Sequence, residues 1–454
     1  MPEHWGAAGS RPLRLRFAVL RRRTEISADP IVYVPGGPGE PTGIDAGSIG
    51  EWWRWLDRQP WLEGRDLVLF DPRGVGLSEP AMACPEFAGA AARVYGAALS
   101  EAAIGKIWAE AAAACHARLA ASGIDLAQYN TAAMVADLKS LLAGFGDGGV
   151  ILLASSYGTR VALRLAADPA VKIEAMILDG VDPPDEQEYV ALAPDAARAF
   201  TGLFQRCAAM ASCKENYPDL ADRFARLVAA AAAAPLAVEI GDVEGKPFTA
   251  RLDDAKLIEF LLTGFYDRRQ IDALPGVIAA LAGGDTTKLR PLARLALDNY
   301  RAGRLSFGVF LSAECHDDFP FNPRGAVARA AAQAPLFRNY ALANLPLAAC
   351  PFWPSGMAAA AERAAASSAV PTLILSGDLD PATPPRWAKE AADDLPHAFL
   401  IRFHGIGHGV LDDRPCVSHL VGRFVADPTA APVNDCTQAL EPPPIRRLAK
   451  PRRH

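Results

Sequence analysis

The chain has 454 residues, of which 51% are hydrophobic and 22% are charged, and its formal net charge is −6. This composition is ordinary for a globular protein, so it excludes the disordered and fibrous classes, and the acidic balance argues against a nucleic-acid partner. No apolar run reaches the roughly 18 residues of a membrane span, so we expect no membrane-spanning helix.

The first part of the chain alternates apolar runs with helical spacing. Apolar and basic residues alternate over 13–19, which predicts a half-buried strand. Helix-like apolar spacing appears at 132–142 and 159–167. Short, continuous apolar runs predict buried strands at 31–34, 67–70, 150–154 and 175–178. Such strands separated by helices indicate a mostly parallel sheet that is covered on both faces.

The strand pattern fades after about residue 185. Successive helices are expected at 191–210, 219–233, 254–265, 270–282 and 288–302, and strands resume at 372–375 and 399–401. The length also favours a core domain with a large insertion. We therefore expect an α/β core in two parts, 13–184 and 366–437, with a helical cap inserted at 185–365 and a basic tail at 438–454.

The strongest local pattern surrounds Ser156. The apolar run 150–154 leads through Ser155, Ser156, Tyr157 and Gly158 into a predicted helix. A tight strand-to-helix turn of this kind projects one serine from the sheet and is typical of a nucleophile elbow. Ser156 is the candidate nucleophile, and the backbone N–H of Tyr157 is a candidate oxyanion donor. A plain strand-to-helix turn is the alternative reading.

A glycine-rich turn follows the strand at 31–34. Acyl transfer needs a second N–H aimed at the developing oxyanion, and glycines let the backbone approach a ligand closely. Gly37 is the preferred donor and Gly36 the near alternative. An ordinary Pro/Gly turn is the non-catalytic reading.

Two later loops supply a carboxylate and an imidazole. Asp380 and Asp378 compete for the acid, and Asp380 is favoured because Pro381 and Thr383-Pro384 make its loop rigid. A turn without chemistry is the alternative reading for this loop. His408 lies among glycines after the last strand and is the candidate general base, with His404 as its competitor. An exposed, non-catalytic histidine is the further alternative.

The three candidates occur in the order Ser156, Asp380, His408. This is the order of α/β hydrolases, and each residue follows a predicted strand, where sites of open α/β sheets assemble. We therefore predict the α/β-hydrolase fold and a serine hydrolase mechanism through an acyl-enzyme. This mechanism requires no metal and no cofactor.

The same residues resemble the proline iminopeptidase and tripeptidyl aminopeptidase group of α/β hydrolases, from about Leu13 to Cys436. Pro35 and Ala154 depart from the pattern, because the group usually has His and Gly at these positions. The motifs that carry the resemblance are Gly36-Gly37-Pro38-Gly39, Asp71-Pro72-Arg73-Gly74-Val75-Gly76-Leu77-Ser78, Ser156-Tyr157-Gly158-Thr159, Leu178-Asp179-Gly180, Gly377 to Pro384 and Gly405-Ile406-Gly407-His408-Gly409.

The resemblance implies a peptidase acting at a free N-terminus, and a carboxylesterase or other small-molecule acyl hydrolase is the alternative. The partner is therefore a peptide or a small acyl substrate, and oligomeric state stays open. Such a peptidase needs an anionic residue for the substrate ammonium, and Glu314 and Asp317 are candidates. A solvated acidic loop is the alternative for these two residues.

Eight cysteines suggest four disulfides and an oxidising compartment, although buried free thiols are the alternative. The segment 1–11 has no apolar region typical of a signal peptide, so a cytoplasmic location stays open. The resemblance favours a secreted or periplasmic enzyme. It also implies the pairings Cys84–Cys115, Cys207–Cys213, Cys315–Cys350 and Cys416–Cys436.

Overall fold

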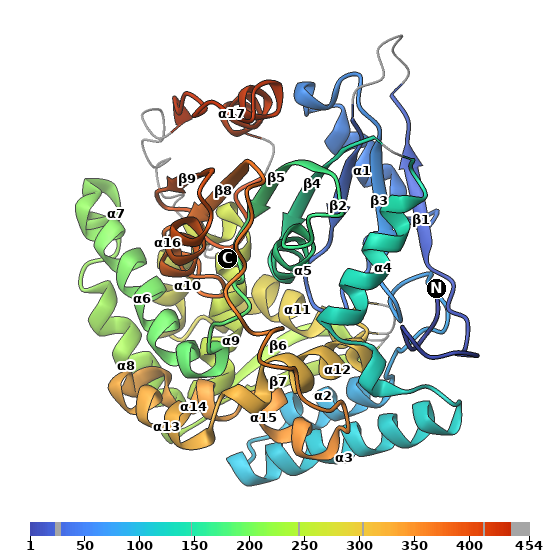
Figure 1. Cartoon of the computed structure of the whole chain (residues 1–454). Helices are drawn as coiled ribbons and strands as arrows, with labels where there is room; N and C mark the ends of the chain where they lie inside the picture. Colours follow the sequence, from blue (N-terminus) through green and yellow to red (C-terminus); the bar gives the residue numbers. More distant parts are fainter. Residues whose placement is uncertain (23–28, 147, 244–245, 302–303, 412–413, 437–454) are drawn as a thin grey trace.

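The computed structural model describes residues 1–22, 29–146, 148–243, 246–301, 304–411 and 414–436 (Figure 1). The predicted basic tail, 438–454, lies outside the described residues. Across the described part of the chain, no helix has both the length and the apolar character needed to cross a bilayer.

A seven-stranded sheet forms the core, in the order β1-β3-β2-β4-β5-β8-β9. Its strands are β1 (Arg16–Leu20), β2 (Ile31–Val34), β3 (Leu67–Asp71), β4 (Val150–Ser155), β5 (Ile173–Asp179), β8 (Thr372–Gly377) and β9 (Ala398–Phe403). Only the pairing of β1 with β3 is antiparallel. The predicted mostly parallel sheet is confirmed.

Helices cover both faces of this sheet, as the apolar strands require. In β4, Ile151 and Leu153 join one buried cluster, whereas Leu152 and Ala154 join the other, because successive side chains point to opposite faces. The first cluster includes residues of α1 (Ile49–Leu56) and α17 (Pro415–Ala426). The second includes residues of α4 (Thr131–Ala143), α5 (Tyr157–Ala166) and α16 (Pro385–Asp394).

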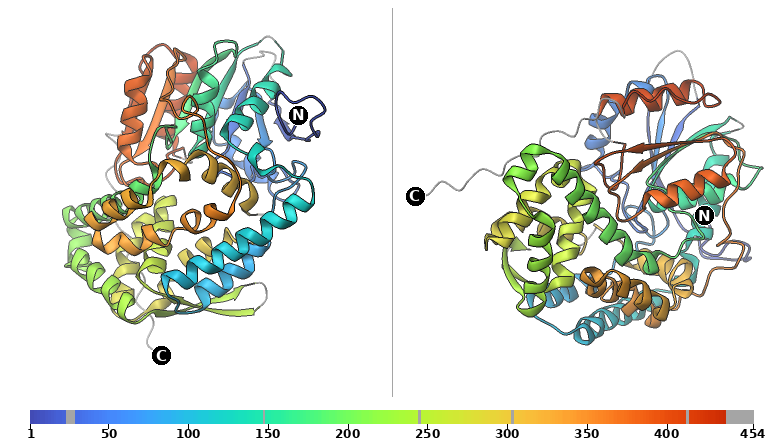
Figure 2. Two further views of the ribbon diagram at one scale, coloured as in Figure 1. Left: turned by 60° about the horizontal axis from the view of Figure 1, so that its bottom comes forward. Right: turned by 90° about the vertical axis from the view of Figure 1, so that its left-hand side faces the viewer.

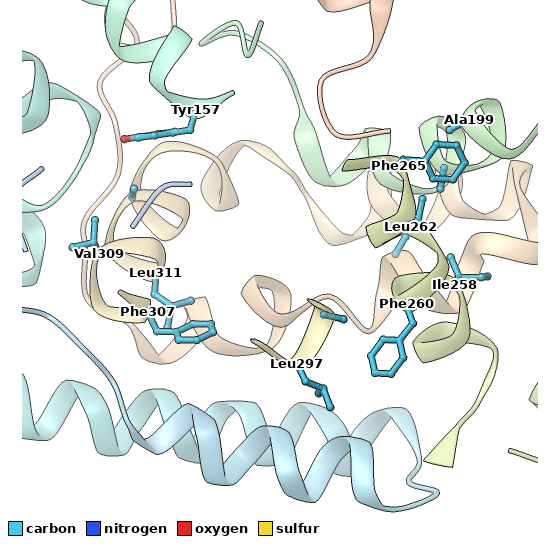
Figure 3. Packing of buried hydrophobic residues seen from close by; sticks show 14 of the residues in the cluster. Tyr157, Ala199, Ile258, Phe260, Leu262, Phe265, Leu297, Phe307, Val309 and Leu311 are labelled. Atoms are coloured by element: carbon cyan, nitrogen blue, oxygen red, sulfur yellow. The ribbon is translucent and has the colours of Figure 1, made fainter. Parts of the chain in front are cut away.

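A second, mainly helical part lies between β5 and β8 in the sequence. Its helices are α6 (Glu188–Ala209), α7 (Ala211–Asn216), α8 (Leu220–Ala233), α9 (Asp254–Leu262), α10 (Arg268–Ala282), α11 (Arg290–Asp298), α12 (Phe307–Asp317), α13 (Arg324–Gln333), α14 (Arg338–Leu342) and α15 (Leu345–Ala349). Figure 3 shows part of its buried packing, including Phe260, Leu297 and Phe307. The five helices predicted in this region correspond to α6, α8, α9, α10 and α11.

Two features of this part differ from the purely helical expectation. A hairpin of β6 (Leu236–Val243) and β7 (Lys246–Leu252) lies inside it, because alternate residues such as Val238 and Ile240 are buried. In addition, α2 (Glu86–Gly96) and α3 (Glu101–Ala121) run along this part, where α2 packs on β7 and α3 on α15 (Figure 2).

All eight cysteines are paired. The bridges are Cys84–Cys115, Cys207–Cys213, Cys315–Cys350 and Cys416–Cys436. Each pairing implied by the family resemblance is thus confirmed. Cys84–Cys115 involves α3, whereas Cys207–Cys213 and Cys315–Cys350 lie in the mainly helical part between β5 and β8. Cys416–Cys436 connects α17 to the segment that follows it.

Candidate active site

Ser156 occupies the turn between β4 and α5. Its φ is 54° and its ψ is −130°, a conformation that non-glycine residues seldom adopt. The helix begins directly against the end of β2, because a Cβ on Gly158 would overlap the carbonyl oxygen of Val34. Ala154 lies within β4 without a positive φ, so its methyl group causes no strain there.

Asp380 and His408 form a buried pair. His408 Nδ1 lies 2.9 Å from Asp380 Oδ2, and the side chains are 12% and 1% exposed. Thr383 Oγ1 donates to the same carboxylate oxygen over 2.7 Å, and the N–H groups of Ala382 and Thr383 donate to Oδ1. The loop after β8 therefore holds this carboxylate in one orientation.

The pair shifts the ionisation of both partners. Burial opposes the charged form of Asp380, but the charge and hydrogen bond of His408 outweigh it and lower the pKa of Asp380. Burial also opposes protonation of His408, but the nearby Asp380 carboxylate outweighs it and raises the pKa of His408. The arrangement thus favours an ionised carboxylate beside an imidazole that readily accepts a proton.

Contacts from two sides fix the His408 loop. The backbone N–H of His408 donates to Phe265 O over 2.8 Å, and a Cβ on Gly407 would overlap that same oxygen. Asp179, at the end of β5, accepts from the N–H groups of Val410 and Leu411 at 2.7 to 2.9 Å. Both the sheet and the helical part therefore determine where the imidazole lies.

Ser156 and His408 line one cavity of about 970 Å³. Its sheet side also includes Gly36 and Gly37, and Gly37 has a φ of 114° that suits glycine. The helical part contributes the opposite wall, where Tyr266 meets the His408 ring edge-on with the centroids 4.8 Å apart. A substrate in this cavity would contact both the sheet loops and the helical part.

The two predicted oxyanion donors lie on either side of the nucleophile turn. A Cβ on Gly36 would lie 3.1 Å from Ser156 Cβ, so the loop that carries Gly37 closely approaches Ser156. Tyr157 begins α5, and its hydroxyl lies 2.7 Å from Thr131 Oγ1 in a buried contact. Any contact of Tyr157 with substrate would therefore come from its backbone.

The competing residues Asp378 and His404 pair with each other outside the cavity. His404 Nδ1 lies 3.1 Å from Asp378 Oδ2, and the His404 side chain is 77% exposed. The N–H of Gly405 donates to the other Asp378 oxygen over 2.7 Å. Neither residue lines the cavity that contains Ser156.

Glu314 and Asp317 lie in α12, but neither lines that cavity. Glu314 is buried and accepts a hydrogen bond from Tyr189 Oη. Asp317 is buried and accepts from the Thr131 hydroxyl over 2.7 Å. Both carboxylates point at α4 and α6 instead, so the structure does not bring them to Ser156.

Five carboxylates line the cavity. Asp179 belongs to a motif that carries the resemblance, whereas Glu40, Glu259, Asp267 and Asp298 were missed in the sequence. For Glu259 a local signal exists, because this single acid lies within the apolar run of α9. No motif marks the other three.

The groups of side chains able to hold a metal ion are not part of the lining of this cavity. In the described residues, one such group combines Glu188, Glu314 and Asp318, and another combines His316, Asp317 and Glu362. None of these side chains lines the cavity with Ser156.

Residues 29–236 match the family model described as the alpha/beta hydrolase fold, and residues 334–437 match the TAP-like protein model. This chain has the α/β-hydrolase fold. The two matched regions carry the loops of Ser156, Asp380 and His408.

Curated relatives of this α/β hydrolase include peptidases. Serine protease Hip1 of Mycobacterium tuberculosis is 28% identical over 434 residues, which cover 88% of this chain and 79% of the relative. Tripeptidyl aminopeptidase of Streptomyces lividans is 27% identical over 421 residues, covering 87% and 74%. A thermophilic esterase from Thermogutta terrifontis aligns over 89% of each chain with 16% identity and a TM-score of 0.35.

Proposed function

We propose that this α/β hydrolase is a serine peptidase that cleaves near a free N-terminus, with Ser156, Asp380 and His408 as its catalytic residues. The observation that carries the proposal is the cavity in which a strained serine and a carboxylate-paired histidine are both exposed to the same space. The names of the relatives support peptide over other acyl substrates.

The proposed mechanism follows from these positions. His408 accepts the Ser156 hydroxyl proton while the serine oxygen bonds to the scissile carbonyl carbon. The N–H groups of Gly37 and Tyr157 stabilise the oxyanion. His408 then gives the proton to the departing amine. Water, deprotonated by His408, hydrolyses the ester and restores Ser156, and Asp380 stabilises the imidazolium in both halves.

The main competing function is hydrolysis of small esters by the same residues, because a shared fold does not determine the substrate. Two peptide p-nitroanilides of identical sequence separate the functions, one with a free and one with an acetylated N-terminus. An aminopeptidase is expected to cleave the free peptide far faster. If acetylation leaves kcat/KM unchanged while p-nitrophenyl acetate is hydrolysed, the aminopeptidase proposal is wrong.

We also propose that the protein works in an oxidising compartment such as the periplasm or the extracellular space. Four disulfides support this, because such bonds persist where thiols are not kept reduced. Mass spectrometry of alkylated protein from its native source tests the proposal. Unmodified cysteines throughout are expected, and alkylation of all eight would contradict it.

A further inference from the structure

A second cavity, of about 670 Å³, adjoins the cavity that contains Ser156. The linings of the two cavities have six residues in common: Tyr33, Glu40, Pro41, Ser155, Arg304 and Leu305. Ser155 directly precedes Ser156, so the two cavities meet beside the nucleophile turn. Neither Ser156 nor His408 lines the second cavity, so the mechanism proposed above gives this space no role.

Glu40 connects the second cavity to the imidazole. It lines both cavities, and its charge acts on His408: burial alone would lower the pKa of His408, and Glu40 is among the carboxylates that raise it. The side chains of Glu40 and Arg304 are exposed, so the boundary between the cavities consists here of long side chains rather than of packed core. In the proposed mechanism His408 protonates the departing amine, and the departing part of the peptide therefore begins beside this boundary.

One face of α1 forms a wall of the second cavity. Glu51, Trp52 and Trp55 line it, and their spacing of three and four residues places them on one side of the helix. The Trp52 indole N–H donates to the carbonyl oxygen of Thr42 over 2.7 Å, and the Trp52 ring lies 4.9 Å from the ring of Tyr33. Trp55 meets Trp52 edge-on with the centroids 5.6 Å apart. This wall is therefore aromatic, and contacts within the protein hold its rings in place.

The second cavity is acidic as well as aromatic. Among the described residues of its lining, Arg304 is the single cation, and it pairs with Asp298 of the first cavity at 2.7 Å. The carboxylates of the lining are Glu40, Asp45, Glu51 and Asp71. Asp45 and Asp71 accept hydrogen bonds from backbone N–H groups of their own loops. Glu51 is 79% exposed and lies 3.7 Å from Arg54, a loose contact that a ligand can replace.

An arginine side chain matches these walls. Its planar guanidinium stacks on tryptophan and tyrosine rings and donates to carboxylates at the same time. A cleft lined mainly by carboxylates also raises the local concentration of basic peptides. A glutamate side chain would meet like charge in this place, and a neutral side chain would gain from the rings alone. Positive charge together with a flat shape is therefore the property that the second cavity selects.

We propose that the second cavity binds an arginine side chain in the departing part of the peptide, between Glu51 and the tryptophans of α1. The inference rests on the proposed peptidase function and adds the class of peptide that the enzyme selects. The N-terminal part, which is short for an aminopeptidase, stays in the cavity that the helical part encloses. The departing part crosses the boundary at Glu40 and Arg304, so the two parts of the substrate are recognised in different cavities.

The test uses peptides that begin with the sequence of a cleaved p-nitroanilide and continue with three alanines as the departing part. One alanine at a time is replaced by arginine, by citrulline, which has nearly the same shape but no charge, or by glutamate. Mass spectrometry of the products gives kcat/KM for each peptide. At one position at least, the arginine peptide should exceed the citrulline peptide about tenfold, and the glutamate peptide should be the poorest.

The variant is Glu51→Lys, which reverses the charge of a side chain that lines only the second cavity. The matched control is Asp57→Lys, which makes the same charge change at an exposed position at the end of α1, outside both linings. In Glu51→Lys the ratio of kcat/KM for arginine to that for citrulline should fall about threefold or more, whereas Asp57→Lys should keep the wild-type ratio. Thermal unfolding checks that both variants are folded.

Three results overturn the inference. These are equal rates for arginine and citrulline at every position in the wild type, an unchanged ratio in Glu51→Lys, and loss of the ratio in Asp57→Lys. A p-nitroanilide that is cleaved without any arginine preference in the longer peptides refutes the inference alone. A wild type that hydrolyses p-nitrophenyl acetate but no peptide with a free N-terminus refutes the proposed function, and the inference with it.

A second variant gives a readout that does not depend on charge. Ala81 is exposed and lines only the second cavity, so Ala81→Trp places a large ring in that space. The ratio of kcat/KM for the arginine peptide to that for the p-nitroanilide, which has no departing peptide, should fall about tenfold, because the ring competes for the same volume. An unchanged ratio in the folded variant would show that the departing part lies elsewhere and would overturn the inference.

Discussion

Two Asp–His pairs connect the same two loops of this molecule. Asp380 and His408 are 2.9 Å apart, and Asp378 and His404 are 3.1 Å apart, yet the histidines are 12% and 77% exposed. Only His408 lines the cavity with Ser156. Contact between an Asp and a His side chain therefore does not identify a catalytic pair by itself. Burial and a cavity shared with Ser156 distinguish the pair that we propose as catalytic.

The register of the last two strands explains the difference. The N–H of Asp378 donates to Phe403 O over 3.0 Å, so this residue still continues the pairing of β8 with β9 and its side chain stays at the sheet edge. Asp380 comes two residues later, inside a turn that supplies three donors to its carboxylate. The loop, rather than the strand, buries the acid.

Replacing each histidine by alanine should give the largest difference in kcat between the two pairs. His408→Ala is expected to lower kcat by about 10⁶, the size seen when a triad histidine is removed in a serine protease. His404→Ala should leave kcat within about twofold, because an exposed side chain is replaced. Steady-state kinetics on one peptide substrate measures both. Comparable losses in the two variants would contradict our assignment of the base.

Replacing each aspartate by asparagine should give a smaller difference in kcat, again with the larger loss at the buried pair. Asp380→Asn is expected to lower kcat by about 10⁴, because the amide no longer stabilises the imidazolium or selects the correct tautomer. Asp378→Asn serves as the isosteric control and should retain nearly full activity. If Asp378→Asn proved the more damaging variant, Asp378 would be the catalytic acid instead.

The hydroxyl of Thr383, which donates to Asp380, should contribute less to kcat than Asp380 itself. Thr383→Val removes the hydroxyl that donates to Asp380 but leaves two backbone donors in place. Loss of one hydrogen bond to a charged group should reduce kcat by about tenfold. Thermal unfolding of the variant checks that the protein is folded. Wild-type kcat would show that the two N–H groups suffice to orient the carboxylate.

The smallest effect concerns pH. His408 acts as a base only when neutral, and its pKa is raised by Asp380, so kcat/KM should fall as the pH drops through a value above the ordinary 6.5 of histidine. In Asp380→Asn the residual activity should persist to lower pH, because the stabilising carboxylate is gone. A rate profile of wild type, Asp380→Asn and Asp378→Asn measures this. A midpoint shared by all three contradicts the pairing.

Local sequence was sufficient for the strands and the loops that follow them. Short apolar runs bounded by Gly and Pro predicted β2, β4 and β8 with their turns, because a buried parallel strand needs little context to be recognised. The cysteine pairings came from family resemblance rather than from spacing. The roles of Ser156, Asp380 and His408 remain predictions for the kinetic tests above.

The helical part was harder to predict, for physical reasons. Glu314 and Asp317 were expected near the substrate, but the rotation of α12 about its axis depends on packing against α4 and α6, which no local pattern encodes. The hairpin of β6 and β7 was missed because only a few alternating residues mark it. Glu259 was missed because only the folded chain brings Tyr95 and Tyr300, which are distant in the sequence, to its side of the cavity.

Labelling with a fluorophosphonate probe tests whether Ser156 is the nucleophile. We predict one covalent adduct per folded molecule, located on Ser156 by peptide mass spectrometry, and none in a folded Ser156→Ala variant. A wild-type protein that stays unlabelled, or an adduct on another residue such as Ser155, would show that Ser156 is not the nucleophile.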